Sequence, residues 1–153
     1  MWINYTAMAG WKLVKEFVVS GLEWVGFSKI NSGKLLCISS QKSTLTDCDS
    51  GETLRCNCEY DEQSLIAYCD ELPDEEISIA GYYGGNLPGC SIQGDRVKVN
   101  KEDSKTTVIF SSALGKERVI FYDYGFYTCG FSHDGKYFVF AQDAGVTLLK
   151  KKF

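Results

Sequence analysis

The 153-residue sequence is poor in the residues and motifs from which hydrolytic and phosphate-binding sites are built. Its single histidine, His133, falls in an expected turn, which argues against a hydrolytic triad. No G-x-S-x-G, H-E-x-x-H or G-x-x-x-x-G-K-[ST] motif occurs, and the only glycine-rich loop, at 81–86, has no adjoining lysine. We therefore predict that the protein is not an enzyme.

Metal-ligand patterns and membrane segments are also missing. No C-x-x-C pair is present and no acids follow the D-x-[DN]-x-[DN]-G spacing, so we expect neither a metal nor another cofactor. No apolar run approaches the ~20 residues that span a bilayer, and the N-terminus lacks the pattern of a signal peptide. The cysteines number seven, an odd count without an export signal, which predicts reduced thiols in a cytoplasmic protein.

Aromatic residues and glycines, in contrast, are abundant. Aromatic side chains make up 14% of the sequence, and fifteen glycines accompany only two prolines. This mixture favours strands joined by tight turns over long helices. The apolar fraction of 44% and the length are those of one globular domain, so we predict a single all-β domain over residues 1–153.

The two ends of the sequence contain a repeat. Residues 21–28 and 125–132 align without a gap as G-x-x-x-x-G-F-S. A glycine-lysine pair follows each segment, at 33–34 and at 135–136, so the two turns differ by two residues. The Asp134-Gly135 dipeptide is a strong hairpin signal. Each unit therefore begins with a strand and a tight turn.

Beyond the lysines the alignment resumes, with 35–40 over 137–142 and 43–46 over 145–148. The run at 137–141 is continuously apolar, which is typical of a strand buried on both faces. Each unit thus predicts an antiparallel meander of inner, buried and outer strands. We expect an upstream strand, at 11–19 and at 118–123, to complete the two units.

These residues carry a family resemblance. The run 131–140 resembles the F-S-x-D-G-K pattern of WD40-like β-propeller blades, and 33–40 with the D-x-x-x-G-E turn at 47–52 resembles the same blade and its closing turn. The resemblance implies repeated four-stranded antiparallel sheets arranged around an axis.

The segment between the repeats has room for one further unit. The lysines of the two turns are 102 residues apart, which leaves ~40–45 residues for a third blade plus an insertion. Closed propellers have roughly four to eight blades, so we predict a partial β-propeller, about half a ring, with exposed edges. The predicted blades are 11–50, 52–99 and 118–151. The strands expected between the repeats are 53–59, 64–69, 76–83, 90–99 and 106–112.

Charge is distributed unevenly along the chain. No Lys or Arg occurs from Cys56 through Asp95, a window with nine acids, whereas the remaining residues carry all sixteen basic residues. Acids interleaved with tyrosines suit a partner rich in Lys and Arg. A solvated face that keeps the protein soluble is the alternative. The predicted partner-binding residues are Asp61, Glu62, Asp70, Glu71, Asp74, Glu75, Glu76, Tyr82 and Tyr83.

Two functional hypotheses follow. A small, acidic, aromatic-rich β protein without catalytic motifs is similar in type to the immunity proteins of bacterial contact-dependent growth inhibition systems. That resemblance implies a cognate toxin as partner, a basic nuclease such as a ribonuclease, whose active site the acids would cover; no direct contact with nucleic acid or a membrane is expected. The alternative is a homodimeric β-propeller that binds a small ligand such as a sugar, stacked on Trp11, Trp24 or Tyr127.

Overall fold

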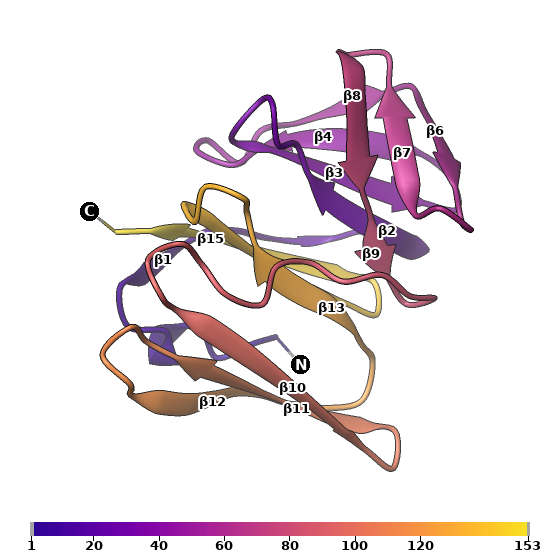
Figure 1. Ribbon diagram of the computed structural model, residues 1–153. Helices are drawn as coiled ribbons and strands as arrows, with labels where there is room; N and C mark the ends of the chain where they lie inside the picture. The colour runs from indigo at the N-terminus through magenta and orange to yellow at the C-terminus, as the bar shows by residue number, and fades with distance from the viewer. Residues whose placement is uncertain (1, 153) are drawn as a thin grey trace.

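The computed structural model describes residues 2–152, which form fifteen strands and one short 3-10 turn, Tyr5–Ala7 (Figure 1). Within this range the strands are grouped in four antiparallel sheets, none of them closed. The prediction of an all-β, antiparallel fold is confirmed. No helix among the described residues has the length and apolar character to cross a membrane.

The two repeats form two sheets with the same strand arrangement. In the first repeat sheet the order is β5-β4-β3-β2-β9, and in the second repeat sheet it is β1-β15-β14-β13. Both inner hairpins carry a bulge at the equivalent position, Glu23 in β2 and Tyr127 in β13. The predicted meander of inner, buried and outer strands is confirmed at both ends, although the first repeat sheet has five strands and the second has four. The strands of these sheets are β1 (Trp11–Val18), β2 (Leu22–Phe27), β3 (Lys34–Ser39), β4 (Ser43–Asp47), β5 (Thr53–Cys56), β9 (Ala80–Gly81), β13 (Phe126–Phe131), β14 (Tyr137–Gln142) and β15 (Gly145–Lys151).

The alignment beyond the first turn was wrong by one residue. The Ser28 amide donates to the Lys34 carbonyl, and the Ser132 amide donates to the Tyr137 carbonyl, so Tyr137 stands where Lys34 stands. Phe138 is therefore the counterpart of Leu35. The two turns differ by one residue, because the shared lysines occupy different positions in them.

The second glycine of each G-x-x-x-x-G motif is explained by a chain segment that crosses its strand. A Cβ on Gly26 would lie 2.4 Å from the Ser78 carbonyl oxygen, and a Cβ on Gly130 would lie 2.4 Å from the Leu87 Cβ. A larger residue at either position requires the crossing backbone to move. Both glycines of the repeat are therefore required by the close approach of another chain segment to their strand.

The upstream strands lie in other sheets than predicted. β1 pairs with β15 and takes, in the second repeat sheet, the edge position that β5 takes in the first. The strand at 118–123, β12 (Glu117–Asp123), pairs with β11 (Lys105–Ser111). The first strand of the chain thus completes its last sheet, and Figure 1 shows β1 beside β15.

The segment between the repeats, expected as one unit with an added strand, forms two sheets. The acidic sheet contains β6 (Cys58–Asp61), β7 (Ile66–Cys69) and β8 (Leu72–Ser78). The basic sheet contains β10 (Arg96–Glu102), β11 and β12. Between them, β9 joins the inner edge of the first repeat sheet by pairing with β2.

The four sheets are stacked in a row, and a hydrophobic core fills each interface. Phe131 and Phe138 pack against Phe110 and Phe121 between the second repeat sheet and the basic sheet. A second core lies between the two repeat sheets, and a third lies between the first repeat sheet and the acidic sheet. Figure 1 shows the acidic sheet at the top right and the basic sheet at the bottom. Each end sheet therefore has only one covered face.

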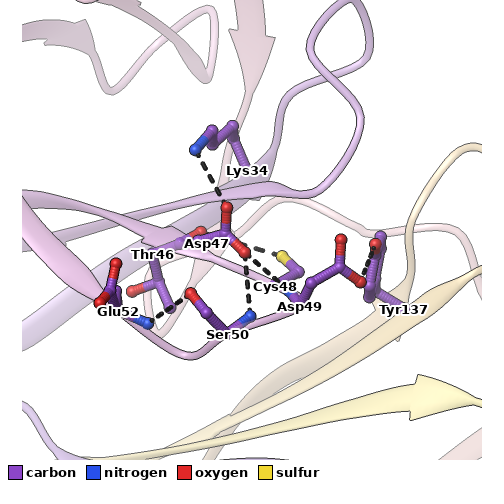
Figure 2. Close-up of polar contacts among 8 residues, drawn as sticks. All are labelled: Lys34, Thr46, Asp47, Cys48, Asp49, Ser50, Glu52 and Tyr137. Atoms are coloured by element: carbon purple, nitrogen blue, oxygen red, sulfur yellow. Dashed lines mark hydrogen bonds and ion pairs between the residues drawn. The ribbon is translucent and has the colours of Figure 1, made fainter.

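The D-x-x-x-G-E turn joins the two repeat sheets (Figure 2). Asp47 Oδ1 accepts hydrogen bonds from the amides of Ser50 (3.0 Å) and Asp49 (2.9 Å), which lower the pKa of Asp47 to about 2. The side chain of Asp49 accepts hydrogen bonds from the Tyr137 hydroxyl at 2.7 Å and from Lys150 Nζ at 2.5 Å. The first aspartate shapes the turn, and the second attaches it to the second repeat sheet.

Candidate protein-docking surface

The outer face of the acidic sheet carries a row of carboxylates around a tyrosine. Ala67 and Cys69 in β7 are buried, so Tyr68 between them points outward and is 50% exposed. Glu59 in β6 is the direct cross-strand partner of Tyr68. The Tyr68 hydroxyl donates to Glu76 Oε1 in β8 at 3.2 Å. The outer-face row Glu59–Tyr68–Glu76 thus crosses all three strands.

Two of the predicted acids lie at the β6–β7 turn. Asp61 and Glu62 are both exposed. The backbone amide of Gln63 donates to Asp61 Oδ1 at 2.8 Å and lowers the pKa of this carboxyl, so Asp61 is charged at neutral pH. These acids extend the outer-face row to one end of the sheet.

Three more acids lie at the other end. Asp70, Glu71 and Asp74 are exposed at the β7–β8 turn and the start of β8. The amide of Asn57 donates to Glu71 Oε1 at 3.1 Å. Because β7 has only four residues, about 10 Å separates the two ends, and one partner can cover both acid groups. Six of the seven predicted acids are thus exposed on the acidic sheet and its turns.

Glu75 is the exception and corrects the prediction. Only 4% exposed, it accepts hydrogen bonds from the Ser28 hydroxyl (2.6 Å) and from the amides of Lys29 (2.6 Å) and Ile30 (3.1 Å). Burial alone raises the pKa of Glu75, but these hydrogen bonds outweigh it and the net shift is downward. Glu75 holds the β2–β3 turn against β8, so its carboxylate is already occupied.

The two predicted tyrosine anchors are exposed but belong to a separate aromatic cluster. Tyr82 and Tyr83 follow β9 and are 62% and 67% exposed. Their ring centroids are 5.0 Å apart. The Tyr82 ring centroid lies 5.2 Å from that of Tyr127, and the Tyr83 ring centroid lies 6.2 Å from that of Trp24. These ring contacts join the tyrosines to the repeat sheets and not to the outer-face row.

The aromatic residues of the sugar hypothesis are mostly buried. Trp11 and Trp24 are 3% and 1% exposed, so neither offers a free ring face for stacking. Tyr127 is half-buried, and its hydroxyl donates to Asp143 at 3.1 Å. Burial and this carboxylate raise the pKa of Tyr127 to about 12. The two tryptophans are core residues.

Asp95, the last acid of the window, is structural as well. It is 1% exposed and accepts hydrogen bonds from Lys151 Nζ (2.6 Å), the Trp11 indole (3.0 Å) and the Ala113 amide (2.8 Å). Burial raises its pKa, but the Lys151 ammonium and the other donors outweigh burial and lower it overall. Asp95 therefore ties the second repeat sheet to the loop before β10.

The opposite charge at the other end of the stack was not predicted. Outward positions of the basic sheet hold Arg96 and Lys98 in β10 and Lys105 in β11. The Lys105 ammonium lies 4.7 Å from the ring centroid of Tyr122 and 5.2 Å from that of Tyr124. The signal was present in the sequence, since basic residues recur as soon as the acid window ends.

Within residues 2–152, no cluster of three or more His, Cys, Asp or Glu side chains has the arrangement of a metal site. Comparison with known proteins finds no protein-family model and no curated protein that matches the chain at a significant level.

Proposed function

We propose that the protein is a binding module whose acidic sheet docks onto a cationic protein. The observation that carries this proposal is the outer-face row Glu59–Tyr68–Glu76 on a sheet face that no other sheet covers. The window from Cys56 through Asp95 contains no Lys or Arg to neutralise it. Such a face accelerates encounter with a basic partner, and the tyrosine ring supplies contact area.

We infer further that the four sheets are blades of an open, WD40-like propeller. The shared bulge and crossing glycine of the repeats support this arrangement, as does the N-terminal strand that completes the last sheet. In this arrangement the acidic and basic sheets bound a gap in the ring. A partner that enters the gap meets the acidic sheet on one side.

The partner that best fits this chemistry is a nuclease toxin, and the protein is then its immunity protein in the bacterial cytoplasm. A nuclease active site is lined with cations that bind phosphates. Exposed carboxylates can occupy those cations in place of the nucleic-acid backbone and block substrate entry. The docking set consists of Asp61, Glu62, Asp70, Glu71, Asp74 and Glu76. Relative to the predicted set, Glu59 and Tyr68 are added, and Glu75, Tyr82 and Tyr83 are removed.

Binding to the C-terminal domain of the protein that the neighbouring gene encodes tests this function. We expect affinity to fall steeply with salt, and Glu76→Lys to weaken binding about tenfold or more, because it places a cation against a basic surface. Glu117→Lys is the matched control, since it makes the same charge change on the exposed edge of the basic sheet. Salt-independent affinity, or equal losses in both variants, would contradict the proposal.

Self-association is the second candidate, favoured by the opposite charges of the two end sheets. The acidic sheet of one copy can face Arg96, Lys98 and Lys105 of another, and two copies can then close a ring. Light scattering distinguishes the two candidates. A dimer near twice 17.1 kDa that dissociates in Glu76→Lys supports self-association, whereas a monomer at micromolar concentration excludes it.

A further inference from the structure

Three cysteine thiols meet on the inner face of the acidic sheet. Cys58 in β6 and Cys69 in β7 are direct cross-strand partners. Cys69 interacts electrostatically with Cys58 and with Cys56, the last residue of β5. The Cys58 thiol donates to the Glu59 carbonyl at 3.6 Å. All three pack against the core between the acidic sheet and the first repeat sheet, and all are reduced.

The strand register places Cys58 and Cys69 at the spacing that a disulfide needs. The Asp70 amide donates to the Asn57 carbonyl at 3.0 Å, which marks the adjacent pair as a hydrogen-bonded one. Antiparallel pairs alternate, so Cys58 and Cys69 form a non-hydrogen-bonded pair, with Cα atoms about 4.5 Å apart. Disulfides span Cα separations of roughly 4.4–6.8 Å, so the two cysteines lie at the short end of the range that the bond can bridge.

Small oxidants can reach one of the two sulfurs. A groove of about 700 Å³ is lined by Cys56 and Cys58, together with Lys42 and Arg55 from the first repeat sheet. Cys58 is half-buried, whereas Cys69 is only 4% exposed. Cys58 is therefore positioned to react first, and Cys69 lies opposite it as the resolving thiol.

We propose that Cys58 and Cys69 form a reversible disulfide when the protein meets a peroxide. The Cys58 sulfur attacks one peroxide oxygen, the O–O bond breaks, and the thiol proton leaves with the other oxygen as water. The Cys69 sulfur then attacks the resulting sulfenic sulfur, and a second water leaves. Two thiols are oxidised by two electrons in total, and hydrogen peroxide is reduced to two waters.

The neighbouring thiols and burial determine the rate of this oxidation through the pKa values of Cys58 and Cys69. The neighbouring Cys69 thiol, followed by burial, raises the pKa of Cys58, and the neighbouring Cys56 thiol raises the pKa of Cys69 to about 12. Thiolates, the reactive species, are consequently scarce at neutral pH. Oxidation should be slow at pH 7, and its rate should rise about tenfold for each unit by which the pH is increased toward the thiol pKa.

Peptide mapping of the full-length protein tests the pairing. We treat the reduced protein with hydrogen peroxide under native conditions, block the remaining thiols by alkylation, and digest without reductant, using a protease that cleaves after Glu because no Lys or Arg lies between the two cysteines. We expect a cross-linked species containing Cys58 and Cys69, which dithiothreitol separates. Cys58→Ser and Cys69→Ser should each abolish it, whereas Cys90→Ser, at an exposed cysteine outside the cluster, should leave it unchanged.

Two results would overturn the proposal: a Cys56–Cys69 linkage in place of the predicted one, or no linkage within the chain while Cys90 is oxidised. Circular dichroism of each variant confirms that it is folded. If a serine variant does not fold, mapping of the wild-type protein decides the question alone. No partner protein takes part, so failure here leaves the docking proposal intact, and failure of docking leaves the disulfide intact.

Discussion

The repeat sheets and the end sheets differ in how they are covered, and their sequences differ accordingly. Strands β3 and β14 are buried on both faces, so nearly every position is apolar. Strands β7 and β8 have one free face, where Tyr68 and Glu76 alternate with buried neighbours. Double burial constrains every residue of a strand, whereas single burial constrains every second one and leaves the others free to carry charge.

The largest effect should come from the cores beside the repeat sheets. Phe131 is fully buried, with ring centroids 5.4 Å from Trp11 and 5.1 Å from Phe138. We expect Phe131→Ala to lower the free energy of unfolding by about 3–5 kcal/mol in urea titrations. Phe27→Ala should cost a similar amount, while Tyr68→Ala on the free face should cost less than about 1 kcal/mol. Comparable losses of stability at all three positions would contradict the view that the repeat sheets are covered on both faces and the acidic sheet on only one.

A buried ion pair should give the next largest effect. Asp95→Asn removes the charge that Lys151 and the Trp11 indole contact. We expect a loss of about 2–3 kcal/mol in chemical denaturation, because charged hydrogen bonds in buried sites are strong. Asp103→Asn, at an exposed turn residue, should change stability by less than about 0.5 kcal/mol. A neutral Asp95→Asn would show that the pair does not stabilise the stack.

Two adjacent acids in β8 sharpen the comparison within one strand. Glu75→Gln places an amide NH₂ against backbone donors and should cost about 1–2 kcal/mol in thermal denaturation. Glu76→Gln should leave stability within about 0.5 kcal/mol but weaken partner binding. The opposite ranking of the two substitutions would mean that the inner and outer faces of the acidic sheet are misassigned.

The smallest expected effect is the acid dependence of the turn between the repeat sheets. The pKa of Asp47 is lowered to about 2 in the folded state, so its contribution to stability is full above its unfolded pKa near 4. That contribution is lost as pH falls from about 4 to 2. Because the side chain is partly exposed, the loss should be below about 1 kcal/mol. The free energy of unfolding of Asp47→Asn should change less with pH over this range than that of the wild-type protein. Equal pH dependence in the two proteins would contradict the assignment.

The repeat sheets could be predicted from the sequence because the same backbone requirements, which only certain residue types meet, occur in both sheets in the same order. The crossing at Gly26 and Gly130, and the turn at Asp134, require particular residue types in any chain with this path. The end sheets carry no such marker, so two sheets were read as one degenerate unit. Pairing of β1 with β15 was equally inaccessible, since strand partners distant in sequence leave no local pattern.

The candidate site was predicted as a region but not residue by residue. Charge along the sequence located the acidic sheet, since the absence of Lys and Arg requires no knowledge of the fold. It could not separate Glu75 from Glu76, because whether a side chain faces inward depends on strand register. Glu59 lay in the same window and was passed over for the same reason.

The pairing of β1 with β15 also has a consequence for biosynthesis. The second repeat sheet cannot acquire its edge strand until β15 has emerged from the ribosome, after all the strands that separate it from β1 in the sequence have been synthesised. During that interval the apolar residues of β1 are exposed to chaperones and to other nascent chains. A circular permutant that joins β15 directly to β1 through a short linker would make this contact local, and it should refold faster than the natural order of strands.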